Sequence, residues 1–206
     1  MIAEAVRRSP LGDYAERFSA LYERSNGAVS IRELPFLTQL NLRADPKDEP
    51  VMRGLALSLG FPLPILPNTV SNRDDRRALW LGPDEWLIVG REGQDNALEQ
   101  ALRAGLNGAF GVIVDVSANR TVLQIRGPGA GELLAHAIPI DLDRRAFPAG
   151  RCAQTLLAKA QVIIEQRDGD AGFHLYVRSS FASYVADWLL DASELDAGYQ
   201  VKRPGV

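Results

Sequence analysis

The chain has 206 residues, 46% of them hydrophobic and 24% charged, proportions that are typical of a packed globular protein and exclude a disordered chain. Lys and Arg number 23 against 26 Asp and Glu, giving a net charge of −3. No positive field is therefore expected that would collect nucleic acid. Cys152 is the single cysteine, and His136 and His174 are the two histidines, which excludes an intrachain disulfide and argues against zinc sites and histidine-based catalysis.

The N-terminal segment predicts an arm followed by a short helix. Residues 1–8 contain an acidic residue and no long apolar run, so they do not resemble a secretory signal, and we expect a cytoplasmic protein. A short amphipathic helix is predicted between Ser9-Pro10 and Asn26-Gly27. Its apolar positions are Tyr14, Phe18, Leu21 and Tyr22.

Two strands are predicted over residues 29–43, followed by a helix that has Pro50 in its first turn and ends at Gly60. Residues 54–72 carry no charge, yet three prolines in this stretch exclude a membrane-spanning helix. We therefore interpret residues 61–67 as an extended proline-rich arm, which either docks a partner or packs on its own domain.

A hairpin is predicted next, because the turn at residues 82–85 separates two apolar runs that contain Trp80 and Trp86. A helix follows it, with apolar residues at helical spacing from Ala97 to Leu102.

The second half repeats this order. Strands are predicted over residues 112–116, 121–126, 153–158, 161–167 and 173–177, with a helix that Pro128 opens. The spacing of the closing helix predicts a buried face. Its members are Phe181, Tyr184, Val185, Trp188 and Leu189.

Short sequence matches support a duplication. Leu40-Asn-Leu-Arg43 stands 83 residues before Leu123-Gln-Ile-Arg126. We infer an α+β fold of two β-α-β-β-type modules, residues 28–108 and 109–192, with mixed or antiparallel sheets related by a pseudo-two-fold axis. An N-terminal arm and helix (1–27) and a tail (193–206) complete the predicted organisation.

Candidate chemical motifs are weak. Residues 126–131, Arg-Gly-Pro-Gly-Ala-Gly, lie between a strand and a helix, but Glu132 stands where the dinucleotide fingerprint needs its third glycine. We interpret this segment as a structural turn. Asp115, Asp141 and Asp143 are not paired by any sequence feature, so turn and cap roles are expected for them.

Three segments carry a resemblance to a known family: Leu34-Pro-Phe-Leu-Thr-Gln-Leu-Asn-Leu42, Leu79-Trp-Leu-Gly-Pro-Asp-Glu-Trp-Leu87 and Gly150-Arg-Cys-Ala-Gln-Thr-Leu-Leu157. Together they resemble the gamma subunits of heterotetrameric sarcosine oxidases, over roughly residues 9–192. Asp115-Val-Ser117 and Gly127-Pro-Gly-Ala130 are more distantly similar to the folate-binding fold of the glycine-cleavage aminomethyltransferases.

The distant resemblance implies where a catalytic carboxylate would lie. Aminomethyltransferases place an essential aspartate on the strand that corresponds to residues 161–164, and no Asp or Glu occurs between Asp143 and Glu165. The second folate signature is also missing, because residues 169–174 end in histidine where a glutamate is expected. We therefore expect the fold to be kept and the active site to be lost.

The closer resemblance implies an assembly that oxidatively demethylates sarcosine to glycine, in sarcosine catabolism and one-carbon metabolism. Its FAD, FMN, NAD and tetrahydrofolate belong to other subunits, and its alpha, beta and delta subunits would be the partners of this chain. We expect a non-catalytic docking subunit with no catalytic, cofactor-binding or metal-binding residues of its own. Two alternatives remain open: a free-standing tetrahydrofolate-binding protein or one-carbon transferase, and a regulatory module of unknown ligand.

The partner surface is predicted from apolar segments that the repeat does not need. The N-terminal helix precedes the repeat, and the arm at 61–67 interrupts the first half with no counterpart in the second. The predicted interface residues are Phe18, Tyr22, Phe61, Leu63, Ile65, Trp80 and Trp86.

Overall fold

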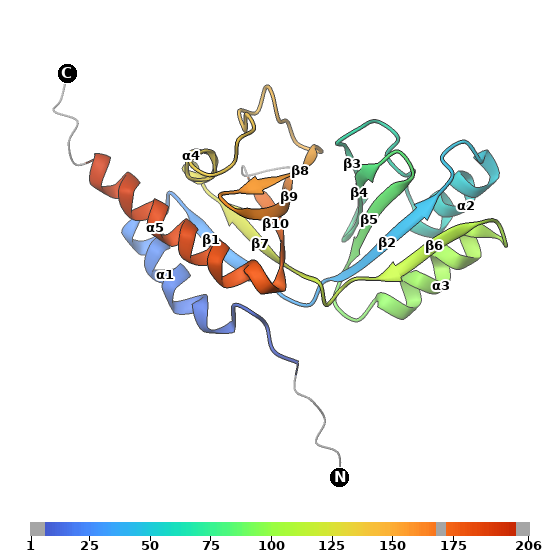
Figure 1. The fold of residues 1–206 in the computed structure, drawn as a ribbon, viewed down its shortest axis with the longest axis horizontal. Helices are drawn as coiled ribbons and strands as arrows, with labels where there is room; N and C mark the ends of the chain where they lie inside the picture. The colour runs from blue at the N-terminus through green and yellow to red at the C-terminus, as the bar shows by residue number, and fades with distance from the viewer. Residues whose placement is uncertain (1–6, 168–171, 201–206) are drawn as a thin grey trace, which may run out of the picture.

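A computed structural model describes residues 7–167 and 172–200. Two five-stranded antiparallel sheets turn their inner faces toward each other, and helices cover their outer faces (Figure 1). The predicted α+β class is confirmed. Within the described residues, no helix combines the length and the apolar character needed to cross a membrane.

The chain begins with a short 3-10 helix, η1 (Gly12–Tyr14), and α1 (Ala15–Arg24). The elements of the first half follow: β1 (Ser30–Leu34), β2 (Thr38–Ala44), α2 (Glu49–Leu59), β3 (Val70–Arg73), β4 (Arg76–Gly82), β5 (Glu85–Gly90) and α3 (Asp95–Leu106). Those of the second half are β6 (Gly111–Asp115), β7 (Arg120–Arg126), α4 (Ala130–Ala135), β8 (Cys152–Leu157), β9 (Ala160–Gln166), β10 (Phe173–Arg178), η2 (Ser179–Phe181) and α5 (Ala182–Gln200).

The duplication is visible in the order of the strands. Sheet B has the order β6-β2-β5-β4-β3, and sheet A has the order β1-β7-β10-β9-β8. These orders become identical when β1 to β5 are matched with β6 to β10. The first strand of each half therefore pairs in the sheet of the other half, which joins the two halves through their backbones.

Three details differ from the sequence prediction. The repeated unit is β-β-α-β-β-β-α, longer than the predicted β-α-β-β type. Strand β3 was not predicted, because its four residues (Val-Ser-Asn-Arg) are mostly polar and none is fully buried. Helix α5 continues through Gln200, into the segment expected to be a tail; residues 201–206 lie outside the described part of the chain.

The proline-rich arm does have a counterpart, so the opposite expectation was wrong. Residues 60–69 connect α2 to β3, and residues 136–151 make the equivalent connection from α4 to β8. The two connections meet, because Thr69 and Arg151 form an isolated antiparallel bridge. The N–H of Val70 also donates to the carbonyl of Gly150 at 2.8 Å.

Helix α2 shows how local sequence sets the elements. The Asp48 side chain accepts a hydrogen bond from the N–H of Val51 at 3.1 Å, Pro50 lies in the first turn, and Gly60 closes the helix with φ +87°. Opposite it, α3 approaches so closely that a Cβ on Gly54 would collide with the carbonyl oxygen of Gly105. The two helices therefore depend on glycine at their crossing.

The closing helix buries only part of the predicted face: Val185 and Leu189 are buried as expected, and Trp188 packs against the core. Phe181, which lies in η2, and Tyr184 are instead 43% and 39% exposed. The other buried positions include Ala182, Ala186 and Leu190. Small residues at two of these positions bring the helix close to the sheet.

The glycine-rich turn has a structural role, as expected. Gly127 has φ +107° and packs against the backbone of Ala28, where any Cβ would collide. The N–H of Gly129 donates to the same carbonyl at 3.0 Å. The turn therefore joins the start of α4 to the segment that enters β1.

Candidate functional site

The inner faces of the two sheets form a small shared core with a charged group inside it. Its apolar members come from both sheets: Leu79, Leu87, Val89, Val122, Cys152, Ile163 and Tyr176. Beside them lie Arg77 of β4 and Glu165 of β9, whose side chains are 7% and 2% exposed. Ionised groups are seldom buried to this extent unless they are paired.

Glu165 is held by hydrogen bonds from both sheets. Arg77 Nη1 donates to Glu165 Oε1 at 2.7 Å across the interface, and the Tyr176 hydroxyl donates to Glu165 Oε2 at 2.8 Å. Arg167 Nη1 donates to Oε1 as well, at 3.2 Å. Glu165 lies one residue beyond residues 161–164, the segment that corresponds to the catalytic aspartate of aminomethyltransferases. Its two carboxylate oxygens accept hydrogen bonds in a structural ion pair.

His174 is buried next to this group, 6% exposed, and faces neighbouring strands rather than solvent. Gln124 Nε2 lies 3.2 Å from His174 Nε2. Among the described residues, His174 Nδ1 has no hydrogen-bond partner, and it lies 3.9 Å from Glu165 Oε2. Burial, together with the positive charges of Arg77 and Arg126, lowers the pKa of His174 to about 4. The imidazole is therefore neutral near pH 7.

Cys152 and Tyr176 are equally unsuited to acid–base or nucleophilic work. Burial and the negative charge of Glu165 raise the pKa of Cys152 to about 12, and its thiol points at the carbonyls of Thr69 and Trp80. The same two causes raise the pKa of Tyr176 well above its ordinary value. A thiol held in its protonated form is a poor nucleophile.

The aspartates singled out from the sequence stay apart and act locally. Asp115 accepts hydrogen bonds from the backbone and hydroxyl of Ser117. Asp143 pairs with Arg145, which lowers its pKa to about 2, and Asp141 accepts from the N–H of Asp143 at 2.9 Å. Within the described residues, no three His, Cys, Asp or Glu side chains are grouped to hold a metal.

The predicted interface residues divide into two classes. Phe18, Phe61, Leu63 and Trp86 are buried in the chain's own core, and Trp80 is half-buried against it. Trp86 Nε1 donates to the carbonyl of Pro64 at 2.8 Å, which ties the proline-rich arm to the hairpin. Two side chains remain exposed, Tyr22 at 52% and Ile65 at 67%.

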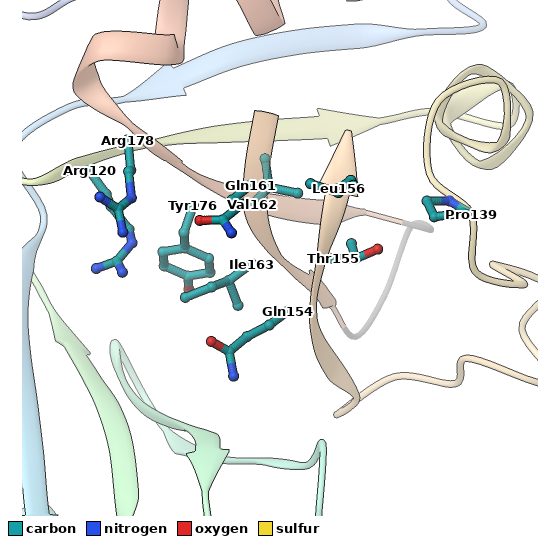
Figure 2. Close-up of a pocket in the computed structure, with 10 residues that line it drawn as sticks. All are labelled: Arg120, Pro139, Gln154, Thr155, Leu156, Gln161, Val162, Ile163, Tyr176 and Arg178. Atoms are coloured by element: carbon teal, nitrogen blue, oxygen red, sulfur yellow. The ribbon is translucent and has the colours of Figure 1, made fainter. Parts of the chain in front are cut away.

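A hollow opens beside the charged group, on the inner face of sheet A (Figure 2). It has a volume of about 480 Å³ and is lined by β7, β8, β9 and β10. Its walls include Leu156, Ile163 and the ring of Tyr176, and Arg120 and Arg178 lie at one end. The sequence analysis predicted neither this hollow nor the Arg77–Glu165 pair. The signal that could have predicted the pair is a charged residue inside each of two mostly apolar strands, Arg77 in β4 and Glu165 in β9.

Comparison with known proteins places the chain in a family. Residues 43–195 match the family described as sarcosine oxidase, gamma subunit family. The sarcosine oxidase subunit gamma of Corynebacterium sp. (strain U-96) is 38% identical over 194 residues, covering 93% of each chain. This chain belongs to the sarcosine oxidase gamma subunit family. The subunit gamma of an Arthrobacter species is 39% identical over 190 residues, covering 91% of this chain and 90% of the relative.

Solved structures agree with the family assignment. The heterotetrameric sarcosine oxidase from Corynebacterium sp. U-96, solved in complex with pyrrole 2-carboxylate, contains a chain that matches with TM-score 0.83 and 35% identity, covering 98% of this chain and all of that one. Aminomethyltransferase T from Bartonella henselae matches with TM-score 0.67 and 15% identity, over 90% of this chain and 57% of that one. The second match confirms the predicted likeness to the aminomethyltransferase fold.

Proposed function

We propose that this chain is the non-catalytic gamma subunit of a heterotetrameric sarcosine oxidase and acts as an architectural, docking component. The observation that carries the proposal is the match to curated gamma subunits over more than nine-tenths of both chains. The structural match to a chain of a heterotetrameric enzyme supports assembly with other subunits. In this proposal the alpha, beta and delta subunits are the partners, and FAD, FMN, NAD and tetrahydrofolate bind outside this chain, in the cytoplasm.

The potentially reactive side chains are already hydrogen-bonded or buried inside this chain, which supports a non-catalytic role. A general base must reach a substrate proton, and its pKa must lie near the working pH. Glu165 is bound by Arg77 and Tyr176, while the pKa values of His174 and Cys152 are moved far from neutrality. These side chains stabilise the contact between the sheets and leave the redox chemistry to other subunits.

Tyr22 and Ile65 are the proposed anchors for the partner. Both side chains are exposed, and they lie on the N-terminal helix and on the arm at 61–67, the two segments for which the sequence predicts a docking role. Truncation of a central aromatic or aliphatic anchor typically weakens association by about 2 kcal/mol or more. Phe18 and Phe61 are poor probes by comparison, because their loss would open cavities in this chain's own core.

Co-purification tests both parts of the proposal. The full chain is co-expressed with the other subunits of its host's sarcosine oxidase, and retention is compared for wild type, Tyr22→Ala, Ile65→Ala and a control, Leu57→Ala. Leu57 is 81% exposed on α2, and its truncation should leave assembly unchanged. Wild-type chain that recovers no flavin-carrying subunit would overturn the assembly, while full retention of both variants would overturn only these anchors.

A further inference from the structure

Two arginines face each other on the inner face of sheet A. Strands β7 and β10 pair antiparallel, and their register places Arg120 directly opposite Arg178. Like charges at directly opposed positions of a sheet are destabilising. Within the part of the chain that the structure describes, neither guanidinium forms a hydrogen bond or an ion pair. The sheet therefore carries two adjacent positive charges without a counter-charge in contact.

The surrounding groups do not remove this repulsion. The pKa of Arg120 is lowered by its burial and by the positive charge of Arg178, and raised to a smaller extent by Glu85. The Glu85 carboxylate is already used elsewhere, because it accepts a hydrogen bond from Asn41 at 2.7 Å and lies 3.9 Å from Arg43 Nη1. An anion between the two guanidinium groups would remove the repulsion and supply hydrogen-bond acceptors.

The arginine pair lies between two hollows. The larger hollow, of about 480 Å³, extends from the pair past the Tyr176 ring and Ile163 toward Leu156 (Figure 2). The smaller one, of about 350 Å³, shares both arginines and adds Ser179 and Ser180. The larger volume falls within the range of roughly 300–1,000 Å³ that small-molecule sites occupy. Away from the arginines its lining combines apolar side chains with the polar Gln154, Thr155 and Gln161.

We propose that this hollow binds a small organic carboxylate. The carboxylate group lies between Arg120 and Arg178, which present planar donor groups suited to paired hydrogen bonds with its two oxygens. The apolar body of the ligand lies along Tyr176, Ile163 and Leu156. The site is separate from the proposed anchors Tyr22 and Ile65, so the proposal does not depend on the docking function.

The probe is 4-fluorobenzoate, followed by ¹⁹F NMR line broadening with the full-length chain. 4-Fluorobenzamide has nearly the same shape without the charge and serves as the neutral control. Binding is measured for wild type, Arg120→Gln, Arg178→Gln and Leu156→Glu, with Arg53→Gln as the matched control. Arg53 is an exposed arginine on α2, on the far side of sheet B.

We expect saturable binding of the benzoate to wild type and to Arg53→Gln. Loss of a hydrogen bond to a charged group weakens affinity by about ten- to hundredfold, and this loss is expected for each of the two arginine variants. Leu156→Glu should also abolish binding, by placing a negative charge at the end of the hollow that faces the ligand body. Because Arg178→Gln removes a like charge, its Tm should be equal to or above that of wild type, which separates a binding role from a structural one.

Three results would overturn the proposal. The first is equal affinity in wild type and in both arginine variants, each shown to be folded by its Tm. The second is binding of the benzamide as tight as that of the benzoate. The third is displacement of the probe by sulfate at concentrations as low as those at which unlabelled benzoate displaces it. The apolar side chains of the hollow would then contribute nothing to the affinity.

Discussion

The ion pair between Arg77 and Glu165 makes a strong prediction about stability. The two side chains join β4 of one sheet to β9 of the other at 2.7 Å, and both are almost fully buried. In the Glu165→Gln variant the amide can still accept from Tyr176, but the buried guanidinium of Arg77 loses its counter-charge. Removing one partner of a buried pair typically costs about 3–5 kcal/mol.

This free energy corresponds to a large shift in melting temperature. For a chain of this size, 1 kcal/mol moves the Tm by about 2–4 °C, so the expected decrease is roughly 6–20 °C. Urea unfolding should show a lower midpoint with an unchanged m-value, because the surface exposed on unfolding is the same. Calorimetry and urea titration of the full chain measure both quantities.

Two comparisons make the test specific. The double variant Arg77→Met, Glu165→Gln removes both charges and should be more stable than Glu165→Gln alone, since residues in one ion pair are strongly coupled. Asp84→Asn removes the surface ion pair in which Arg43 Nη2 lies 2.8 Å from Asp84 Oδ2. Both of these side chains are about half exposed, so this variant should change the Tm little. A Glu165→Gln variant no less stable than Asp84→Asn would refute the role given to the buried pair.

Further predictions follow from the other buried groups. The folded-state pKa of His174 is about 4, below its ordinary 6.5, so the stability that the neutral imidazole contributes is complete above pH 6.5 and is lost as the pH falls toward 4. Between pH 6.5 and pH 4 the free energy of unfolding of wild type, measured by urea titration, should therefore fall by up to about 3 kcal/mol more than that of a His174→Gln variant. Cys152, with its raised pKa, should react with a thiol reagent at pH 8 at the rate of unfolding, and rapid reaction of native protein would contradict this. Gly54→Ala should lower the free energy of unfolding by about 1–3 kcal/mol through its collision with Gly105, although alanine is the better helix former. Gly131→Ala, which meets no atom within 4 Å, should be neutral or stabilising in the same calorimetric measurement.

Local signals in the sequence were sufficient for most elements. Pro50 and Gly60 mark the first turn and the end of α2, where the structure places them. The hairpin of β4 and β5 and the three strands β8 to β10 also follow the predicted runs. These features depend on capping, turn geometry and alternation, which act over a few neighbouring residues.

The features that were missed depend on contacts between distant segments. Phe18 and Phe61 lie in segments whose apolar residues suit a partner surface as well as the chain's own core, and only the assembled fold shows that both pack inward. The register of Arg120 opposite Arg178 joins strands far apart in the chain, so their repulsion could not be read from either strand alone. The pairing of Arg77 with Glu165 likewise needs both sheets in place.

The exchange of first strands joins the two halves through backbone hydrogen bonds. Strand β1 completes sheet A, and β6 completes sheet B, so neither half supplies all the strands of a sheet. The bridge between Thr69 and Arg151 then joins the segments that enter β3 and β8, and the ion pair between Arg77 and Glu165 joins the inner faces of the sheets. Buried charge is best accommodated where its surroundings are rigid, since each hydrogen bond must be kept. A duplicated fold whose halves are joined by paired strands, a backbone bridge and a buried ion pair suits a subunit proposed to dock larger partners.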